Sequence, residues 1–249
     1  MPVQARLIGM SDEERATALA GPAEDVAVLL IEAAEAGHAE AQLLAGQIYL
    51  DGNGVEKDSA EGLRWFGIAA KSGNVMAMNM VGRCCEHGWG TAVDKGLAAQ
   101  WYATAADGGL DWAMYNLATL YALGDGVSQD REEALHLFER AAALGHAKSM
   151  NMIGSFYEDG WVTERDQKQA ACHYQRSAEA GDFRGQFNHA RMLVDQDNIE
   201  EAGIWLTRMA ETATPAFLKK SRAWMVEQSD PVWHRDLIGV LERAISGCK

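Results

Sequence analysis

Small and apolar side chains recur along this chain at a spacing of 36 residues between positions 39 and 182. The recurring positions are Gly46, Gly82, Ala118 and Gly154; Tyr49, Cys85, Tyr121 and Tyr157; Gly52, Gly88, Gly124 and Gly160; Asp58, Asp94, Asp130 and Asp166; and Gly73, Gly109, Gly145 and Gly181. Agreement at so many positions indicates four copies of one unit. The sequence therefore predicts an array of stacked repeats.

The first copy shows why each repeat should form two helices. Ala41, Ala45 and Tyr49 are spaced to lie on one face of a first helix. Gly52 then ends that helix, because glycine adopts the left-handed conformation without a steric penalty. A second helix with Phe66 on its inner face follows and completes an antiparallel hairpin. One hairpin cannot bury its apolar face alone, so neighbouring hairpins must stack.

The start of the second helix carries a capping signal. Asp58 is expected to be the N-cap, and Glu61 three residues later completes a capping box. The same pairing recurs at Asp130 with Glu133 and at Asp166 with Gln169. An N-cap role also explains why these aspartates recur without the ligand order of a calcium loop.

These elements predict an all-α protein, a right-handed α-solenoid of stacked antiparallel helix hairpins with helical caps at both ends. A degenerate fifth copy follows the four full ones and aligns with them only if four residues are deleted. Asp195–Asn198 should therefore form a tighter connection than the glycine turn. The expected division is an N-terminal cap (1–38), four full repeats (39–74, 75–110, 111–146 and 147–182), a shortened fifth repeat (183–214) and a C-terminal cap (215–249).

The repeat resembles a known family. The residues that carry the resemblance in the first copy are Ala45-Gly46, Tyr49, Gly52-x-Gly54-Val55, Asp58, Trp65-Phe66, Ala69-Ala70 and Gly73. They look like the Sel-1-like repeat, a relative of the tetratricopeptide repeat. The third copy matches equally well, whereas the second and fourth carry substitutions, among them Val162 in place of the second turn glycine. The resemblance implies a helical solenoid built for interaction.

The net charge of −14 narrows the choice of partner. Residues 215–249 carry six basic and four acidic side chains, so the rest of the chain carries −16. Such an acidic body repels phosphate backbones and anionic headgroups, which argues against nucleic acid and membrane surfaces and favours a protein partner. The chain shows no signal-peptide pattern, no membrane-spanning apolar stretch and no disulfide framework, so we expect a cytoplasmic protein with reduced thiols.

No motif indicates catalysis or a cofactor. The Gly-x-Gly pairs recur between two helices, whereas a phosphate-binding loop follows a strand. Cys84, Cys85 and His87 lack a second pair of ligands, so we do not expect a metal site. The prediction is a protein that is not an enzyme. The alternative is an enzyme or regulatory subunit with its site in the terminal segments. The residues that suggest this alternative are Trp224, Trp233, His234 and Arg235.

The variable positions of the first helices are the best candidates for a binding site. Counting Ala39 as position 1, positions 2, 5, 9 and 12 of each copy should line the concave face, as in tetratricopeptide repeats. Aromatic and arginine side chains, which dominate binding hot spots, gather there. The candidates are Met76, Asn79, Arg83, Trp112, Tyr115, Lys148, Asn151, Arg184, Phe187 and Arg191. They predict a scaffold or adaptor whose groove binds a peptide or protein partner. The basic side chains among them suit a partner with an acidic element. The alternative is that these side chains pack between adjacent repeats.

The same columns give three smaller expectations. Asn79 and Asn151 are placed to hydrogen-bond an extended peptide main chain. His38 and His146 should be turn residues, because other copies carry Asn74 and Asp182 there. A methionine column should fill the core between helices rather than form a binding stripe. Its members are Met78, Met114 and Met150.

Overall fold

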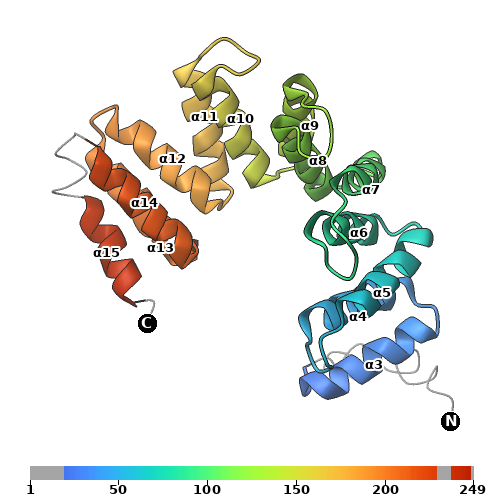
Figure 1. Ribbon diagram of the computed structural model, residues 1–249. Coiled ribbons are helices and arrows are strands. Elements are labelled where there is room, and N and C mark those ends of the chain that lie inside the picture. The colour runs from blue at the N-terminus through green and yellow to red at the C-terminus, as the bar shows by residue number, and fades with distance from the viewer. Residues whose placement is uncertain (1–19, 229–236, 248–249) are drawn as a thin grey trace. The chain divides into compact units, whose positions relative to one another are not determined.

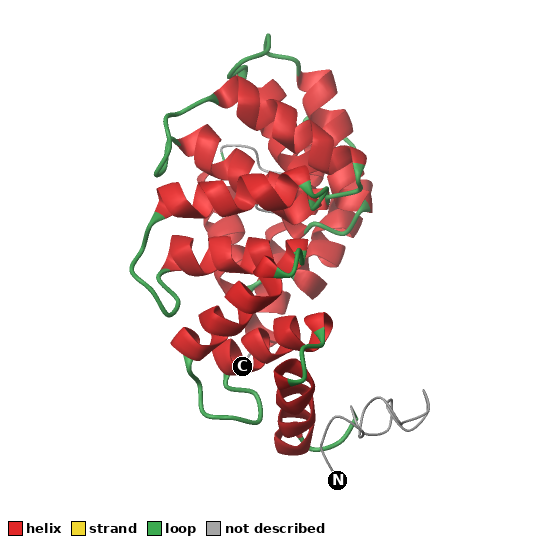
Figure 2. Ribbon diagram, turned by 90° about the vertical axis from the view of Figure 1, so that its right-hand side faces the viewer, coloured by secondary structure: helices red, strands yellow, loops and turns green. Residues whose placement is uncertain are grey.

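The computed structural model describes residues 20–228 and 237–247, and this part of the chain is all-helical (Figure 1). The helices are α3 (Ala23–Glu35), α4 (Ala39–Asp51), α5 (Ser59–Lys71), α6 (Val75–His87), α7 (Lys95–Asp107), α8 (Asp111–Leu123), α9 (Arg131–Ala143), α10 (Ala147–Asp159), α11 (Gln167–Glu179), α12 (Phe183–Val194), α13 (Ile199–Thr212), α14 (Pro215–Glu227) and α15 (Ile238–Gly247). A second view shows helices and loops throughout the described residues (Figure 2). None of these helices is long and apolar enough to span a membrane.

The chain forms two compact units, residues 1–130 and 131–249. In the first unit every two consecutive helices from α3 to α8 pack against each other. In the second unit every two consecutive helices from α9 to α13 do the same. The first helices α4, α6, α10 and α12 therefore each contact the helix before and the helix after them, as in an α-solenoid. The predicted fold class is confirmed.

Small residues in the first helix receive an aromatic ring from the second. A Cβ added to Gly46 would lie 2.5 Å from the Phe66 ring, and one added to Gly82 would lie 2.6 Å from the Tyr102 ring. Phe66 and Tyr102 are completely buried. The recurring glycine is thus required because the aromatic side chain occupies the space of a Cβ.

The two turn glycines have different tasks. Gly52 ends α4 in the left-handed conformation, with φ 75°. Gly54 lies against the start of the preceding helix, because a Cβ there would approach the Ala23 carbonyl oxygen to 2.1 Å. The turn therefore docks, backbone to backbone, on the neighbouring repeat. This contact limits the second turn position of the first repeat to glycine.

The capping-box prediction is half correct. Asp58 caps α5, since its Oδ1 accepts hydrogen bonds from the N–H groups of Ala60 and Glu61 at 2.9 and 3.0 Å. The reciprocal bond is absent, because the Asp58 N–H donates to the Tyr49 carbonyl oxygen at 2.9 Å and Glu61 instead binds Arg64. Asp166 likewise donates its N–H to the Tyr157 carbonyl oxygen. The residue of the tyrosine column thus accepts, with its carbonyl oxygen, the N–H bond that the glutamate side chain would accept in a capping box.

The fifth repeat and the cap share one core in the second unit. α12 and α13 are joined by Asp195–Asn198, as the deletion predicted, and Asp197 adopts φ 62°. Leu206, Leu218 and Leu241, from α13, α14 and α15, are all completely buried in this core. Two capping helices therefore close the array, as expected. Residues 1–19 of the predicted N-terminal cap lie outside the described residues.

Candidate partner-binding surface

In the first unit, position 2 of consecutive first helices exposes apolar surface. Trp112 on α8 exposes 43% of its surface and Met76 on α6 exposes 38%. Tyr115, one turn further along α8, and Arg83, two turns further along α6, are partly exposed. Four of the predicted residues therefore contribute accessible surface to this unit.

The two candidate asparagines join helices instead of facing outward. Asn79 exposes only 4% of its surface, and its Oδ1 accepts a hydrogen bond from Asn116 Nδ2 at 3.0 Å. Asn151 exposes 6% and accepts from Asn188 Nδ2 at 2.8 Å. Both bonds run between consecutive first helices. The proposed contact of Asn79 and Asn151 with a peptide main chain is therefore wrong in this structure, since these carboxamides already bind a neighbouring helix.

Arg83 is held by its own repeat. Its guanidinium lies 5.0 Å from the centre of the Trp89 ring, and Nη1 lies 3.8 Å from the Met80 sulfur. The residue is half-buried. A substitution at Arg83 would therefore disturb packing as well as the surface.

Arg191 forms an ion pair inside the second unit. Its guanidinium contacts both carboxylate oxygens of Glu158, with the shortest distance 3.0 Å, and also lies over the Trp224 ring. Tyr174 donates its hydroxyl to the same carboxylate at 2.6 Å. Burial alone would raise the pKa of Glu158, but the hydrogen bonds from Arg191 and Tyr174 hold it below its usual value. Arg191 therefore links α12 to α10 and is already paired.

The C-terminal cap covers the fifth repeat. Phe187 is 8% exposed, and its ring lies 5.9 Å from Phe217 and 5.5 Å from Trp224, both on α14. Arg184 stays exposed beside the rings of Phe183 and Phe217. Phe187 therefore packs against the cap helix α14.

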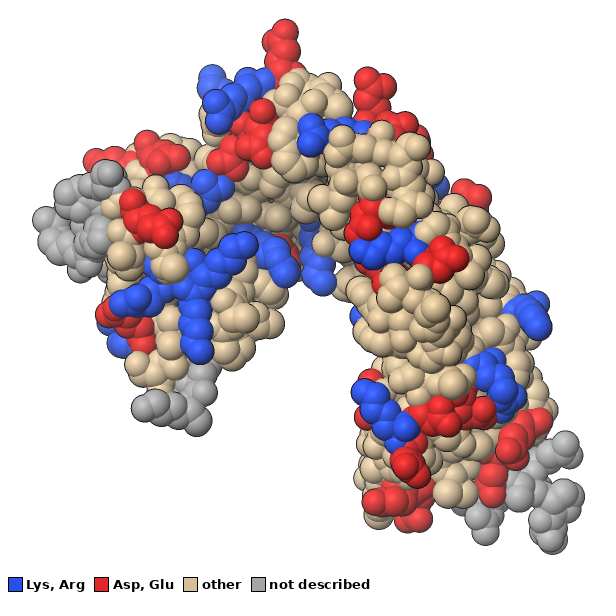
Figure 3. Space-filling model, in the orientation of Figure 1, with Lys and Arg blue, Asp and Glu red and all other residues tan. Residues whose placement is uncertain are grey.

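One group of exposed basic side chains of the second unit lies over α14 (Figure 3). Lys219 and Lys220 are exposed there, and Arg184 lies beside Phe217 at the start of the same helix. Arg222 is paired with Glu242 at 2.7 Å. Lys148 on α10 is half-buried. Arg184, Lys219 and Lys220 thus make a basic patch on a chain of net charge −14.

Two hydrogen-bonded pairs had not been predicted. Tyr102 donates its hydroxyl to Glu86 at 2.6 Å, as Tyr174 does to Glu158. The sequence did carry a signal for both pairs. The aromatic position of the second helix reads Phe66, Tyr102, Phe138 and Tyr174, and position 12 of the same repeats reads Leu50, Glu86, Ala122 and Glu158. Tyrosine occurs where position 12 is glutamate, so the hydroxyl and the carboxylate alternate together.

Among the described residues, no group of three His, Cys, Asp or Glu side chains could hold a metal ion. Cys84 and Cys85 are both buried. His146 is the N-cap of α10, where its side chain accepts from the Ser149 N–H, and His38 is the N-cap of α4. The turn-residue prediction for both histidines is therefore refined to a capping position.

The methionine column and the terminal cluster can also be placed. Met114 and Met150 are buried, as expected for core residues, while Met78 is half-buried. Trp224 packs against Phe187 and Arg191 as part of the cap. The other members of the terminal cluster, Trp233, His234 and Arg235, lie outside the described residues.

The fold and this surface define a helical repeat protein whose first helices carry its exposed variable side chains. The chain belongs to the Sel1 repeat family: the family model matches residues 39–74, 75–110, 113–146 and 147–182, more than half of the sequence. Proteins of this family generally serve as protein-interaction scaffolds and are typically non-catalytic. No curated protein matched the chain significantly.

Solved structures show the same fold. A protective antigen present in uropathogenic Escherichia coli strains, displaying an SLR fold, is 27% identical with a TM-score of 0.68 over 91% of this chain and 50% of that one. This chain therefore spans half the length of that antigen. A Sel1 repeat protein from Oxalobacter formigenes is 24% identical with a TM-score of 0.78, covering 93% and 99% of the two chains. An immunity protein from Pseudomonas aeruginosa is 19% identical with a TM-score of 0.53, covering 98% and 85%.

Proposed function

We propose that this chain is a cytoplasmic, non-catalytic scaffold that binds a peptide or protein partner through the first-helix faces of its repeats. The observation that carries the proposal is the exposure of Trp112 and Met76 at equivalent positions of consecutive first helices. The Asn79–Asn116 hydrogen bond holds these helices together. Large apolar side chains on a rigid support are typical anchors of protein interfaces.

The basic patch of the second unit supports an acidic element in the partner. Arg184, Lys219 and Lys220 are exposed on a chain whose other surfaces are mostly acidic. A partner with an acidic segment would be attracted to this patch and repelled elsewhere, which gives orientation more than raw affinity. Increasing the ionic strength should therefore weaken capture of the partner.

The test is affinity capture from native lysate with three forms of the chain. Trp112→Ala should lose the partner while its circular-dichroism spectrum stays helical. Leu123→Ala is the matched control, because Leu123 lies at the end of the same helix and exposes 65% of its surface. Leu123→Ala should retain the partner. If Trp112→Ala captures the same protein at wild-type affinity, the first-helix surface is not the binding site.

A further inference from the structure

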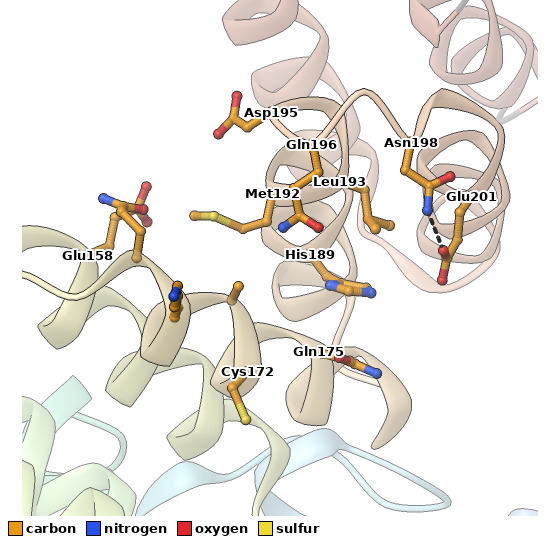
Figure 4. Close-up of a pocket in the computed structure, with 13 residues that line it drawn as sticks. Glu158, Cys172, Gln175, His189, Met192, Leu193, Asp195, Gln196, Asn198 and Glu201 are labelled. Carbon is orange, nitrogen blue, oxygen red and sulfur yellow. Dashed lines mark hydrogen bonds between the residues drawn. The ribbon is translucent and has the colours of Figure 1, made fainter.

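A pocket of about 1030 Å³ opens in the second unit (Figure 4). Gln167, Cys172 and Gln175 on α11 form one wall, and His189 and Met192 on α12 form the other. The connection between α12 and α13 forms its rim. This volume lies at the upper end of the range for sites that bind small molecules or short peptide segments.

The pocket lies where the other repeats place their glycine turn. Gly90 docks on Ser59, the first residue of α5, and Gly126 docks on Lys95, the first residue of α7. The corresponding first residue of α11 is Gln167, which lines the pocket.

The turn that would cover Gln167 is missing. The first repeat connects its helices with residues 52–58, whereas the fifth uses only Asp195–Asn198. Asp195 takes the place of Asp51, the last residue of α4, so the fifth repeat lacks four residues. The shortened connection leaves the start of α11 uncovered by the chain's own loop. The shortened connection and the start of α11 thus both border the pocket.

A buried histidine appears in the same repeat. Position 7 of the first helix is apolar and buried in the four full repeats, where it reads Ala45, Val81, Leu117 and Ile153. In the fifth repeat this position is His189, which exposes 6% of its surface and lines the pocket. Its Nδ1 has no hydrogen-bond partner among the residues that the structure describes. Since burial lowers the pKa of His189, the neutral imidazole offers one donor and one acceptor.

The pocket walls suit a polypeptide main chain. Gln167 and Gln196 supply carboxamides, which both donate and accept hydrogen bonds, as main-chain peptide groups do. The amide nitrogens of Gln175 and Asn198 already donate to Glu179 and Glu201, so these two side chains offer their oxygens as acceptors. Met192 and Leu193 add apolar surface. In Figure 4 the Cys172 sulfur points away from the His189 imidazole, so these two do not form a nucleophile and base. Binding, and not covalent chemistry, fits this arrangement.

We propose that this pocket binds a glycine-containing turn of a protein partner, in place of the loop that the fifth repeat lacks. Glycine is expected at this position because the turns of the second and third repeats approach the start of a helix too closely for a side chain; a Cβ on Gly90 would lie 2.2 Å from the Ser59 carbonyl oxygen. The inference adds a site that is separate from the first-helix surface.

The test uses Cys172 as a reporter, because this exposed thiol lines the pocket while Cys84 and Cys85 are buried. Cys248 is replaced by Ser so that Cys172 is the accessible thiol that N-ethylmaleimide reports. The probe is a blocked synthetic peptide with the sequence of residues 121–130, which contains the turn of the third repeat. The matched control peptide carries Gly126→Ala.

The wild-type peptide should slow alkylation of Cys172 in a saturable way. For a Kd of about 1 mM, about 5 mM peptide slows the rate roughly sixfold, because the protected fraction follows the ratio of ligand concentration to Kd. The control peptide should leave the rate unchanged, and His189→Ile should weaken the protection at least about fivefold. An unchanged rate with the wild-type peptide, or equal protection by both peptides, overturns the proposal.

A graft gives an independent arm. Replacing residues 196–198 by residues 124–130 restores the four missing residues and should fill the pocket. Cys172 in this variant should react slowly without peptide, and added peptide should have no further effect. A graft that folds but leaves Cys172 as reactive as before contradicts the proposal. If the grafted variant does not fold, the protection experiments with the two peptides decide. Trp112→Ala must keep the peptide protection, so failure of either site is distinguishable from failure of the other.

Discussion

Adding a single methyl group tests whether the glycine turn docks on the neighbouring helix. In the first unit, Gly90 and Gly109 both have positive φ, 73° and 86°, and both are exposed. A Cβ at Gly90 would lie 2.2 Å from the Ser59 carbonyl oxygen, whereas a Cβ at Gly109 would meet nothing within 4 Å. Gly90→Ala and Gly109→Ala therefore share the backbone strain and differ in the contact.

The size of the difference follows from these two geometries. The left-handed conformation costs an alanine roughly 1–2 kcal/mol, and both variants carry this cost. Gly90→Ala also forces two backbone segments apart, and overpacking of this kind costs typically about 1–3 kcal/mol. We expect Gly90→Ala to unfold at a free energy about 1–3 kcal/mol lower than Gly109→Ala.

The assay is urea unfolding followed by circular dichroism at about 222 nm. Equal m-values for the two variants would show that the midpoints compare stability and not the cooperativity of the array. If both variants lose the same stability, the turn does not rest on α5. The premise of the pocket proposal would then fail together with this prediction.

Three further outcomes are expected. Arg191→Met should lower the free energy of unfolding by about 2–3 kcal/mol. This is less than the roughly 3–5 kcal/mol for a fully buried pair, because each partner is 20% exposed. Adding Glu158→Gln should recover part of the lost stability in a double-mutant cycle measured by urea denaturation. Because the pKa of Glu158 is lowered by folding, its contribution is complete above the ordinary carboxyl pKa and is lost as pH falls through the lower folded value; wild type should therefore lose more stability than the double variant in urea titrations at successively lower pH. Mass spectrometry after maleimide treatment of Cys248→Ser should find Cys172 modified well before Cys84, whose pKa burial raises to about 11; early labelling of Cys84 would contradict its burial.

The sequence predicts the fold well because every copy of the repeat has to meet the same packing requirements. Gly46 is small because Phe66 fills the space above it, and the same requirement returns in the next copy as Gly82 and Tyr102. A spacing that satisfies one interface satisfies all of them. The periodicity therefore indicates the hairpins, the turns and their order before any contact is known.

The binding surface was predicted less well, for two physical reasons. Position 5 lies at the edge between the exposed and the packed sides of the first helix, so a small rotation decides whether Asn79 faces solvent or binds Asn116. Coverage of Phe187 by Trp224 joins residues from different helices beyond the regular array. A repeat pattern describes contacts between neighbouring copies. It carries no information about how a helix outside the array, here α14, packs against the fifth repeat.

The departures from the repeat are more informative than its consensus. The fourth repeat replaces the docking glycine by Val162, and there Arg131, at the start of α9, lies over the ring of Trp161 instead. The fifth repeat removes the turn altogether. A cap needs only a polar outer face, and a glycine turn is polar and exposed, so closing the array does not require its deletion. Nor does it require a buried imidazole, His189, at a position where the full repeats carry aliphatic side chains, since an unpaired buried nitrogen costs stability. The shortened connection and the unpaired Nδ1 of His189 lie at one pocket, and a bound peptide turn accounts for both.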